Sequence, residues 1–202
     1  MFIKLALENP FIYFLIVFTL IFSIVLHELA HGFAAIYEGD DTPHVTGHIT
    51  LNPMVHLGAV SLCCAFVFGI VWGLMPLNPD QFRHGRWGHA LVALAGPMTN
   101  LAIALQCCLY LKKSTYPDSI VQVLVIVALI NFLIGFVNLL PLPGLDGFCI
   151  LLLIFPDLKP ISYHPLTFFA NLFLLGLLTS GAFGLDAAIS KVLINLLTYL
   201  TH

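Results

Sequence analysis

Apolar residues fall into five long stretches along this chain, separated by short polar connections. The stretches cover residues 11–35, 57–77, 89–111, 120–155 and 165–199. A helix that crosses a bilayer needs about 20 apolar residues, so each of the first three stretches is long enough to do so. The pattern predicts an all-α polytopic membrane protein, a bundle of about five to six membrane helices.

The fourth stretch is too long for one straight span and contains residues that break helices. Pro141, Pro143, Gly144 and Gly147 lie close together in it and cannot continue a regular helix. We therefore expect a broken helix with an extended piece inside. Non-helical backbone at membrane depth is tolerated only where it is buried in protein or lines a wet cavity, so this segment is a candidate site.

Two further interruptions shape the expected fold. In the polar connection 38–53, β-branched residues alternate with others from Thr46 and an Asn-Pro pair closes the run. This pattern predicts a short β-strand, which could grip an extended substrate, and a simple surface turn is the alternative. The fifth stretch is interrupted at residues 181–184, and Asp186 is placed to cap a second, shorter helix.

Composition narrows the class of protein. Hydrophobic residues make up 60% of the 202 residues, charged residues 8%, and the mean hydropathy is +1.02. No polar block is long enough for a soluble domain, so we expect one membrane-embedded domain over residues 1–202. The net charge of −3 leaves no basic stripe for nucleic acid.

The N-terminal stretch and the cysteines add two expectations. A secretory signal has an apolar region of about 7–15 residues, whereas the first stretch is longer, so we interpret it as a retained span. The five cysteines lie in apolar stretches without a C-x-x-C pair, and we expect small buried hydrophobic side chains rather than disulfides.

Candidate chemistry lies in the first stretch, at His27-Glu28-Leu29-Ala30-His31. A helix places residues i and i+4 on one face, so both imidazoles can bind one zinc ion while Glu28 reaches a water on the metal. A charged group near the middle of a membrane span costs roughly 2.5–3.5 kcal/mol, so such residues need a function. The motif indicates a zinc metalloprotease that acts within a membrane.

A catalytic zinc site with two histidines needs a third protein ligand and keeps an open position for water. Asp146 is the better candidate, because it lies in the broken part of the fourth stretch and Gly147 beside it permits close approach of backbones. Asp186 is the alternative, although a capping role explains it without a metal.

The depth of these ligands constrains the topology. His31 lies near the C-terminal end of the first stretch, and Asp146 lies near the far end of the fourth. The two stretches must therefore run in the same direction, so one of the two stretches between them cannot cross the membrane. We expect residues 57–77, interrupted by Gly58, Gly69 and Gly73, to form a re-entrant element.

Several motifs in order resemble those of the site-2 protease family of intramembrane zinc metalloproteases, in the small form without added soluble domains. They are LHELAHG at 26–32, GDDT at 39–42, GHITLNP at 47–53 with His56, AGPMTNL at 95–101 and NLLPLPGLDG at 138–147. The sequence departs from the family pattern at His44, His48 and Gly58, which affects surface contacts more than chemistry.

The resemblance implies a role for each motif. It implies that His27, His31 and Asp146 bind zinc and that Glu28 is the general base. It also implies that Asn100 and Asn138 lie near the substrate, which would be a transmembrane segment of a partner protein, although Asn100 also suits a helix start.

Two other classes of function stay open at this point. Intramembrane His, Glu and Asp could form the transit site of a metal-ion transporter, but repeated halves and several acidic spans are missing from the sequence. A non-catalytic protein that binds a partner helix is the other possibility, although it would not need Glu28. We expect a multi-pass protein of a prokaryotic plasma membrane, and the sequence assigns no oligomeric state.

Overall fold

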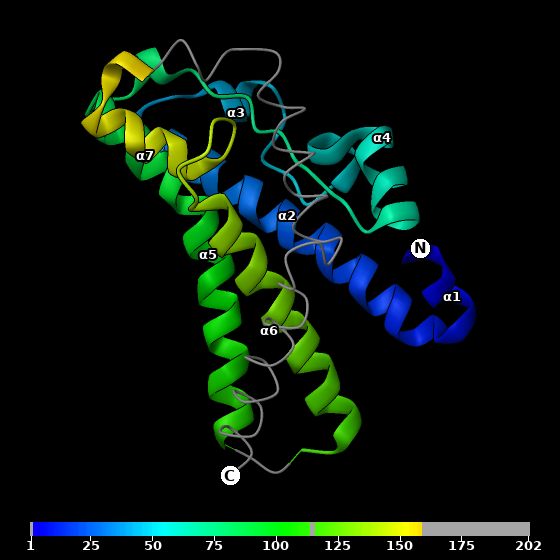
Figure 1. Ribbon diagram of the computed structural model, residues 1–202. Helices are drawn as coiled ribbons and strands as arrows, with labels where there is room; N and C mark the ends of the chain where they lie inside the picture. Colours follow the sequence, from blue (N-terminus) through cyan, green and yellow to red (C-terminus); the bar gives the residue numbers. More distant parts are fainter. Residues whose placement is uncertain (1, 114–115, 159–202) are drawn as a thin grey trace.

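The computed structural model describes residues 2–113 and 116–158, and in this part every regular element is helical (Figure 1). The seven α-helices are α1 (Leu5–Glu8), α2 (Pro10–Glu38), α3 (Thr42–Val45), α4 (Pro53–Phe68), α5 (Arg86–Lys113), α6 (Asp118–Asn138) and α7 (Asp146–Ile154). Short 3-10 helices cover Phe2–Lys4, Pro79–Gln81 and Pro156–Leu158.

Helices α2, α5 and α6 are long and apolar enough to cross a membrane. Helix α2 begins after Asn9, whose side chain accepts a hydrogen bond from the Ile12 amide, and it ends at Gly39 in a left-handed conformation. The predicted fifth stretch, with its interruption at 181–184 and Asp186, lies outside the described residues. The described part therefore contains three of the five to six membrane helices that the sequence predicts.

The three long helices pack as two antiparallel pairs. His31 on α2 lies opposite Val92 on α5, and His27 lies opposite Asn100. Asn100 in turn contacts Asn131 on α6, and α5 and α6 pack against each other more extensively than any other two described helices. Helices α2 and α6 thus run in the same direction, as the depth of the ligands predicts. Figure 1 shows α2 crossing the α5–α6 pair obliquely, with its N-terminal half diverging from it.

The segment after α3 turns back on itself. Helix α4 is kinked at Gly58, where φ is 68° and ψ is 171°, and it ends at Gly69 in a left-handed conformation. Residues 70–78 then return beside α4 without helical structure. The Ser61 hydroxyl donates to the Trp72 carbonyl and accepts from the Trp72 amide, and the Leu74 amide donates to the His56 carbonyl. This path has the shape that a re-entrant element requires.

The predicted β-strand at 46–53 is absent. Residues 46–47 form a turn and α4 begins at Pro53, and no strand occurs in residues 2–113 or 116–158. An isolated extended segment has no neighbouring strand to pair with, and local bonds replace a ladder. The Thr50 amide donates to the His48 carbonyl, and the Thr50 carbonyl accepts from the His56 ring.

The helix break in the fourth stretch is where the sequence predicts it. Helix α6 ends at Asn138, and α7 begins at Asp146. The connection contains both prolines, which lack a backbone donor, and Gly144 with φ of 90°. Asp146 therefore becomes the first residue of a new helix and can point back into the bundle.

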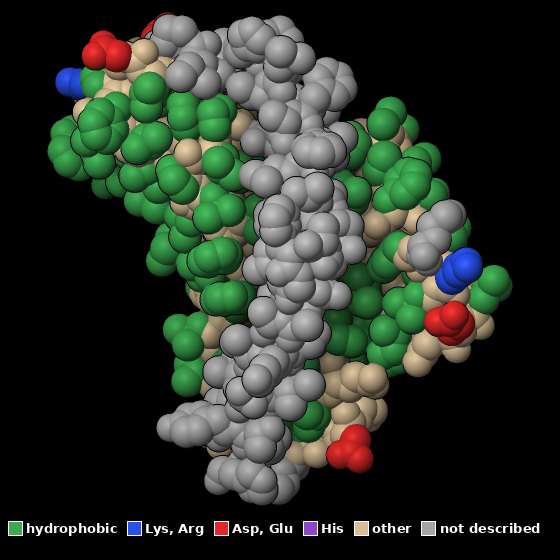
Figure 2. Space-filling model, viewed as in Figure 1, with side chains coloured by type: hydrophobic (Ala, Val, Ile, Leu, Met, Phe, Trp, Pro, Cys, Tyr) green, Lys and Arg blue, Asp and Glu red, His purple; other side chains and the backbone are tan. Residues whose placement is uncertain are grey.

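Hydrophobic side chains cover most of the described surface in Figure 2, and charged side chains gather at the ends of the helices. A buried cluster nevertheless joins α2 to α4 through residues such as Val17, Val25 and Ala65. All five cysteines are free, but the expected burial holds only for Cys107, and Cys63 is exposed. An apolar exterior of this kind suits contact with lipid.

Candidate metal centre

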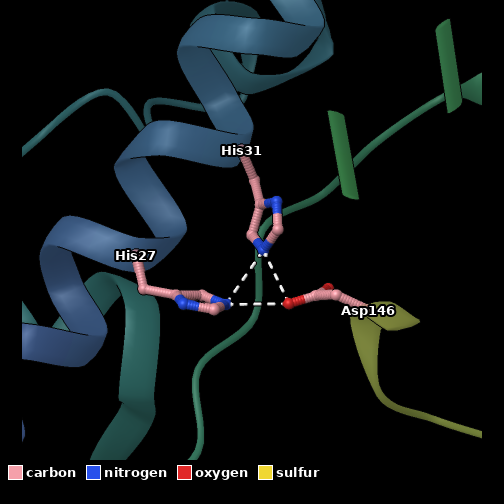
Figure 3. Close-up of side chains that lie close together, drawn as sticks. All are labelled: His27, His31 and Asp146. Atoms are coloured by element: carbon pink, nitrogen blue, oxygen red, sulfur yellow. Dashed lines mark hydrogen bonds and ion pairs between the residues drawn. The ribbon is translucent and has the colours of Figure 1, made fainter. Parts of the chain in front are cut away.

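His27 and His31 point from successive turns of α2 toward the start of α7 (Figure 3). Their Nε2 atoms lie 3.0 Å apart. The Oδ2 atom of Asp146 lies 3.0 Å from Nε2 of His27 and 3.3 Å from Nε2 of His31. These three side chains are the one group in the described part of the chain whose ligand atoms converge closely enough to hold a metal.

The other nitrogen of each imidazole, Nδ1, makes a hydrogen bond on the side away from Asp146. Nδ1 of His31 donates to the backbone carbonyl of Val92 at 2.7 Å, and a carbonyl can only accept. Nδ1 of His27 donates to Oδ1 of Asn100 at 2.6 Å. In a neutral imidazole the second nitrogen is then unprotonated, so both Nε2 lone pairs face Asp146.

This orientation fits a cation. Two imidazole lone pairs and a carboxylate oxygen face one another, and the two Nε2 atoms are too close for both to carry a proton. A positive ion at this point removes the repulsion among all three acceptors. Tetrahedral zinc with bonds of about 2.0–2.1 Å holds its ligand atoms roughly 3.3–3.4 Å apart, close to the spacing found here. The two nitrogens and one oxygen are ligands that zinc accepts.

Glu28 lies beside these ligands. It is buried on α2 and within electrostatic range of His27, His31 and Asp146. The backbone at Gly73, in the returning segment 70–78, passes so close that a Cβ atom there would collide with the Glu28 carboxylate. No hydrogen bond within the described part of the chain occupies that carboxylate, so it is available to exchange a proton.

Two glycines make room for the centre. A Cβ atom on Gly96 of α5 would collide with Nε2 of both His27 and His31. A Cβ atom on Gly147 would collide with the backbone carbonyls of Leu139 and Leu140. The close backbone approach predicted at Gly147 is confirmed, and it packs the start of α7 against the end of α6.

The two predicted substrate residues, Asn100 and Asn138, differ in burial and in hydrogen bonding. Asn100 is fully buried behind His27, and its amide bonds His27, the Ser23 carbonyl and Asn131. Asn138 is half-buried at the end of α6, and its described hydrogen bond is to Ile134 in the same helix. The amide oxygen and nitrogen of Asn100 are thus both hydrogen-bonded, whereas no residue in the described part of the chain bonds the Oδ1 atom of Asn138.

Sequence reasoning missed three parts of this centre: Gly96, the Val92 carbonyl and Asn131. Gly96 belongs to a motif recognised only as part of a family pattern. A backbone carbonyl leaves no mark in a sequence. Asn131 did leave a signal, because it is an amide inside an otherwise apolar stretch, and such a residue needs a hydrogen-bonding partner.

Comparisons with known proteins agree on one family. The family model described as "Peptidase family M50" matches residues 108–178, which include Asp146. A Bacillus subtilis protein named "Putative zinc metalloprotease YwhC" is 35% identical over 146 residues, which cover 67% of this chain and 67% of that protein.

Two mycobacterial proteins named "Putative zinc metalloprotease Rip2" are also similar. The Mycobacterium tuberculosis H37Rv protein is 31% identical over 76% of this chain and 62% of its own length. The Mycolicibacterium smegmatis protein is 31% identical over 68% of this chain and 56% of its own length. The chain thus spans less than two thirds of these mycobacterial relatives. No solved structure gives a significant match.

Proposed function

Because this chain belongs to peptidase family M50, the site-2 protease family of zinc metalloproteases, we propose that it hydrolyses a peptide bond within or near a transmembrane segment of a partner protein. One observation carries the proposal. His27, His31 and Asp146 converge with Glu28 beside them, and the helix that carries the two histidines and Glu28, α2, is long and apolar enough to cross a membrane.

Each residue has a role in this proposal. His27, His31 and Asp146 hold zinc, which when bound supplies a Lewis acid and lowers the pKa of a coordinated water to about 7. Glu28 accepts the proton of the attacking water and then delivers it to the leaving amine. It is buried, and no hydrogen bond within the described residues competes for its carboxylate, which supports both transfers.

The substrate must present an accessible carbonyl. In an intact helix each carbonyl is bonded to the amide four residues later, so a transmembrane substrate has to unwind locally before attack. Segments with Gly, Pro or Asn unwind at lower cost, so we expect cleavage near such residues. Asn138, at the rim of the helix break, is the residue we propose to contact the substrate backbone.

The biological setting follows from the same proposal. Cleavage of a membrane-bound partner would release a fragment, which suits regulated intramembrane proteolysis. The similar proteins are bacterial, so we propose a prokaryotic plasma membrane as the location.

The test compares two glutamate-to-glutamine variants in detergent, with a model transmembrane substrate that contains a Gly-Pro pair. Glu28→Gln keeps the size of the side chain but removes the base, so we expect cleavage to fall by about 10²–10⁴-fold. Glu8→Gln changes an exposed residue of α1 in the same way and should cleave like the wild type.

The outcome separates the three classes of function. Wild-type cleavage by Glu28→Gln would contradict the proposed mechanism. A wild-type protein that cuts no substrate but carries zinc into proteoliposomes would instead be a transporter. A protein that only captures the model substrate would be a helix-binding protein.

A further inference from the structure

A chain of buried amides connects α6 to the metal centre. Asn131 on α6 and Asn100 on α5 are both buried, and Nδ2 of Asn100 donates to Oδ1 of Asn131 at 2.9 Å. Oδ1 of Asn100 accepts from Nδ1 of His27 at 2.6 Å. Three helices are therefore joined by consecutive hydrogen bonds that end at a proposed zinc ligand.

The direction of these hydrogen bonds is set at the α6 end, by the Val127 carbonyl. Nδ2 of Asn131 donates to the Val127 carbonyl at 2.9 Å, and a carbonyl can only accept. The Asn131 amide is thereby oriented with its oxygen toward Asn100. Asn100 must turn its NH₂ group toward Asn131, where it also reaches the Ser23 carbonyl at 3.2 Å.

The orientation of Asn100 then decides which nitrogen of His27 carries hydrogen. With its oxygen toward His27, Asn100 requires a hydrogen on Nδ1 and leaves the lone pair of Nε2 facing Asp146 and His31. If the Asn100 amide were flipped, its NH₂ group would favour hydrogen on Nε2 instead. That tautomer cannot bind a metal through Nε2.

We propose that Asn131 is a positioning residue of the zinc centre, which acts through Asn100 to hold His27 in its metal-binding tautomer. This inference rests on the proposed function only in taking His27 as a zinc ligand. Asn131 itself touches neither zinc nor substrate. The hydrogen bonds to Val127 and Asn100 explain why a costly amide is placed inside an apolar span.

The test uses two variants with opposite expectations. Asn131→Leu fills similar space without polar atoms, so the Asn100 amide loses its stronger orienting partner. Asn131→Asp keeps the direction of the bonds, because a buried neutral carboxyl donates to the Val127 carbonyl and accepts from Asn100. Thr99→Val is the matched control, since among the described residues the Thr99 hydroxyl bonds only the Ala95 carbonyl of its own helix.

Two readouts do not depend on cleavage. Competition with a zinc chelator measures affinity, and loss of the group that bonds a metal-ligating histidine typically costs 10–100-fold. Asn131 acts through that group, Asn100, which stays in place, so we expect Asn131→Leu to weaken zinc binding by about 10-fold, the lower end of this range. Nitrogen-15 NMR of histidine-labelled, zinc-free protein measures the tautomer of His27. We expect a mixture in Asn131→Leu and a single Nδ1–H form in the wild type, Asn131→Asp and Thr99→Val.

A role limited to packing predicts the reverse order, with leucine tolerated in an apolar helix and aspartate not. The proposal is wrong if Asn131→Leu keeps wild-type zinc affinity and one His27 tautomer, or if Asn131→Asp binds zinc less well than Asn131→Leu. Both readouts remain informative if the protein cleaves no substrate, so failure of this inference is distinguishable from failure of the proposed protease activity.

Discussion

At the scale of single residues, the metal centre depends on the groups that hydrogen-bond the Nδ1 atoms of its two histidines. The two imidazoles lie on α2, but the Val92 carbonyl and the Asn100 amide that orient them lie on α5. Gly96 lies between these two supports, against both Nε2 atoms. One face of α5 therefore both orients the histidines and leaves the space that a metal ion needs.

Gly96→Ala tests this arrangement. Overpacking a filled site costs about 1–3 kcal/mol, so we expect zinc affinity to fall by about 5- to 150-fold in chelator competition. Alanine favours a helix over glycine by about 0.8–1.0 kcal/mol, so α5 itself should not be weakened. Ala102→Val enlarges an exposed residue of α5 and should leave zinc affinity unchanged. Unchanged affinity in Gly96→Ala would mean that the metal lies elsewhere.

The three side chains proposed to bind zinc could be predicted from sequence, whereas the groups that hydrogen-bond the two imidazoles could not. The i and i+4 histidines follow from helix geometry alone, and Asp146 follows from its place in a broken helix. The partners of Nδ1 depend on how α5 packs against α2, which no local pattern encodes. The resemblance implies that Asn100 lies near the substrate, and the structure adds its hydrogen bond with His27, which the sequence does not reveal.

At the scale of elements, the returning segment 70–78 covers the side of α2 that carries Glu28 and Gly32. It passes over Glu28 at Gly73, and Met75 packs against Gly32. Its two ends are fixed: Trp72 bonds Ser61 on α4, and the Asn78 amide donates to the buried carboxylate of Asp40. The segment is thus held as a strap between α4 and the end of α2.

Ser61→Ala should loosen one end of this strap. Each lost hydrogen bond contributes about 0.5–1.5 kcal/mol, so amides at residues 70–76 should exchange with deuterium at least about fivefold faster. Mass spectrometry of peptides from this segment provides the measurement. Ser119→Ala, at an exposed position near the start of α6, is the control. Exchange at the wild-type rate in Ser61→Ala would show that the two Ser61 bonds do not hold the strap.

Sequence patterns predict an element correctly where neighbouring residues alone determine its structure. The break between α6 and α7 follows from prolines and glycines, whose effect on a helix does not depend on neighbours. Residues 46–53 form no β-strand, because a strand also needs a pairing partner and the described part of the fold supplies none there, and the alternative of a turn holds at residues 46–47. The return of 70–78 beside α4 depends on glycines and on the bonds of Ser61, of which only the glycines could be recognised beforehand.

At the scale of the whole molecule, the centre joins two distant parts of the chain. His27 and Asp146 are 119 residues apart in sequence, but Nε2 of His27 lies 3.0 Å from Oδ2 of Asp146. They meet because α2 and α6 run in the same direction and the chain between them turns back once beside α4. The requirement for one common depth predicts that direction, but it leaves the number of spans open, because that number depends on residues beyond the described part.

The central claim is that His27, His31 and Asp146 hold one zinc ion, and the zinc content of purified protein tests it most directly. We would measure zinc per chain by elemental mass spectrometry in the wild type, Asp146→Ala and Asp186→Ala. The account predicts about one zinc in the wild type and in Asp186→Ala, and a loss of most zinc in Asp146→Ala. A wild type without zinc, or full zinc content in Asp146→Ala, would contradict it.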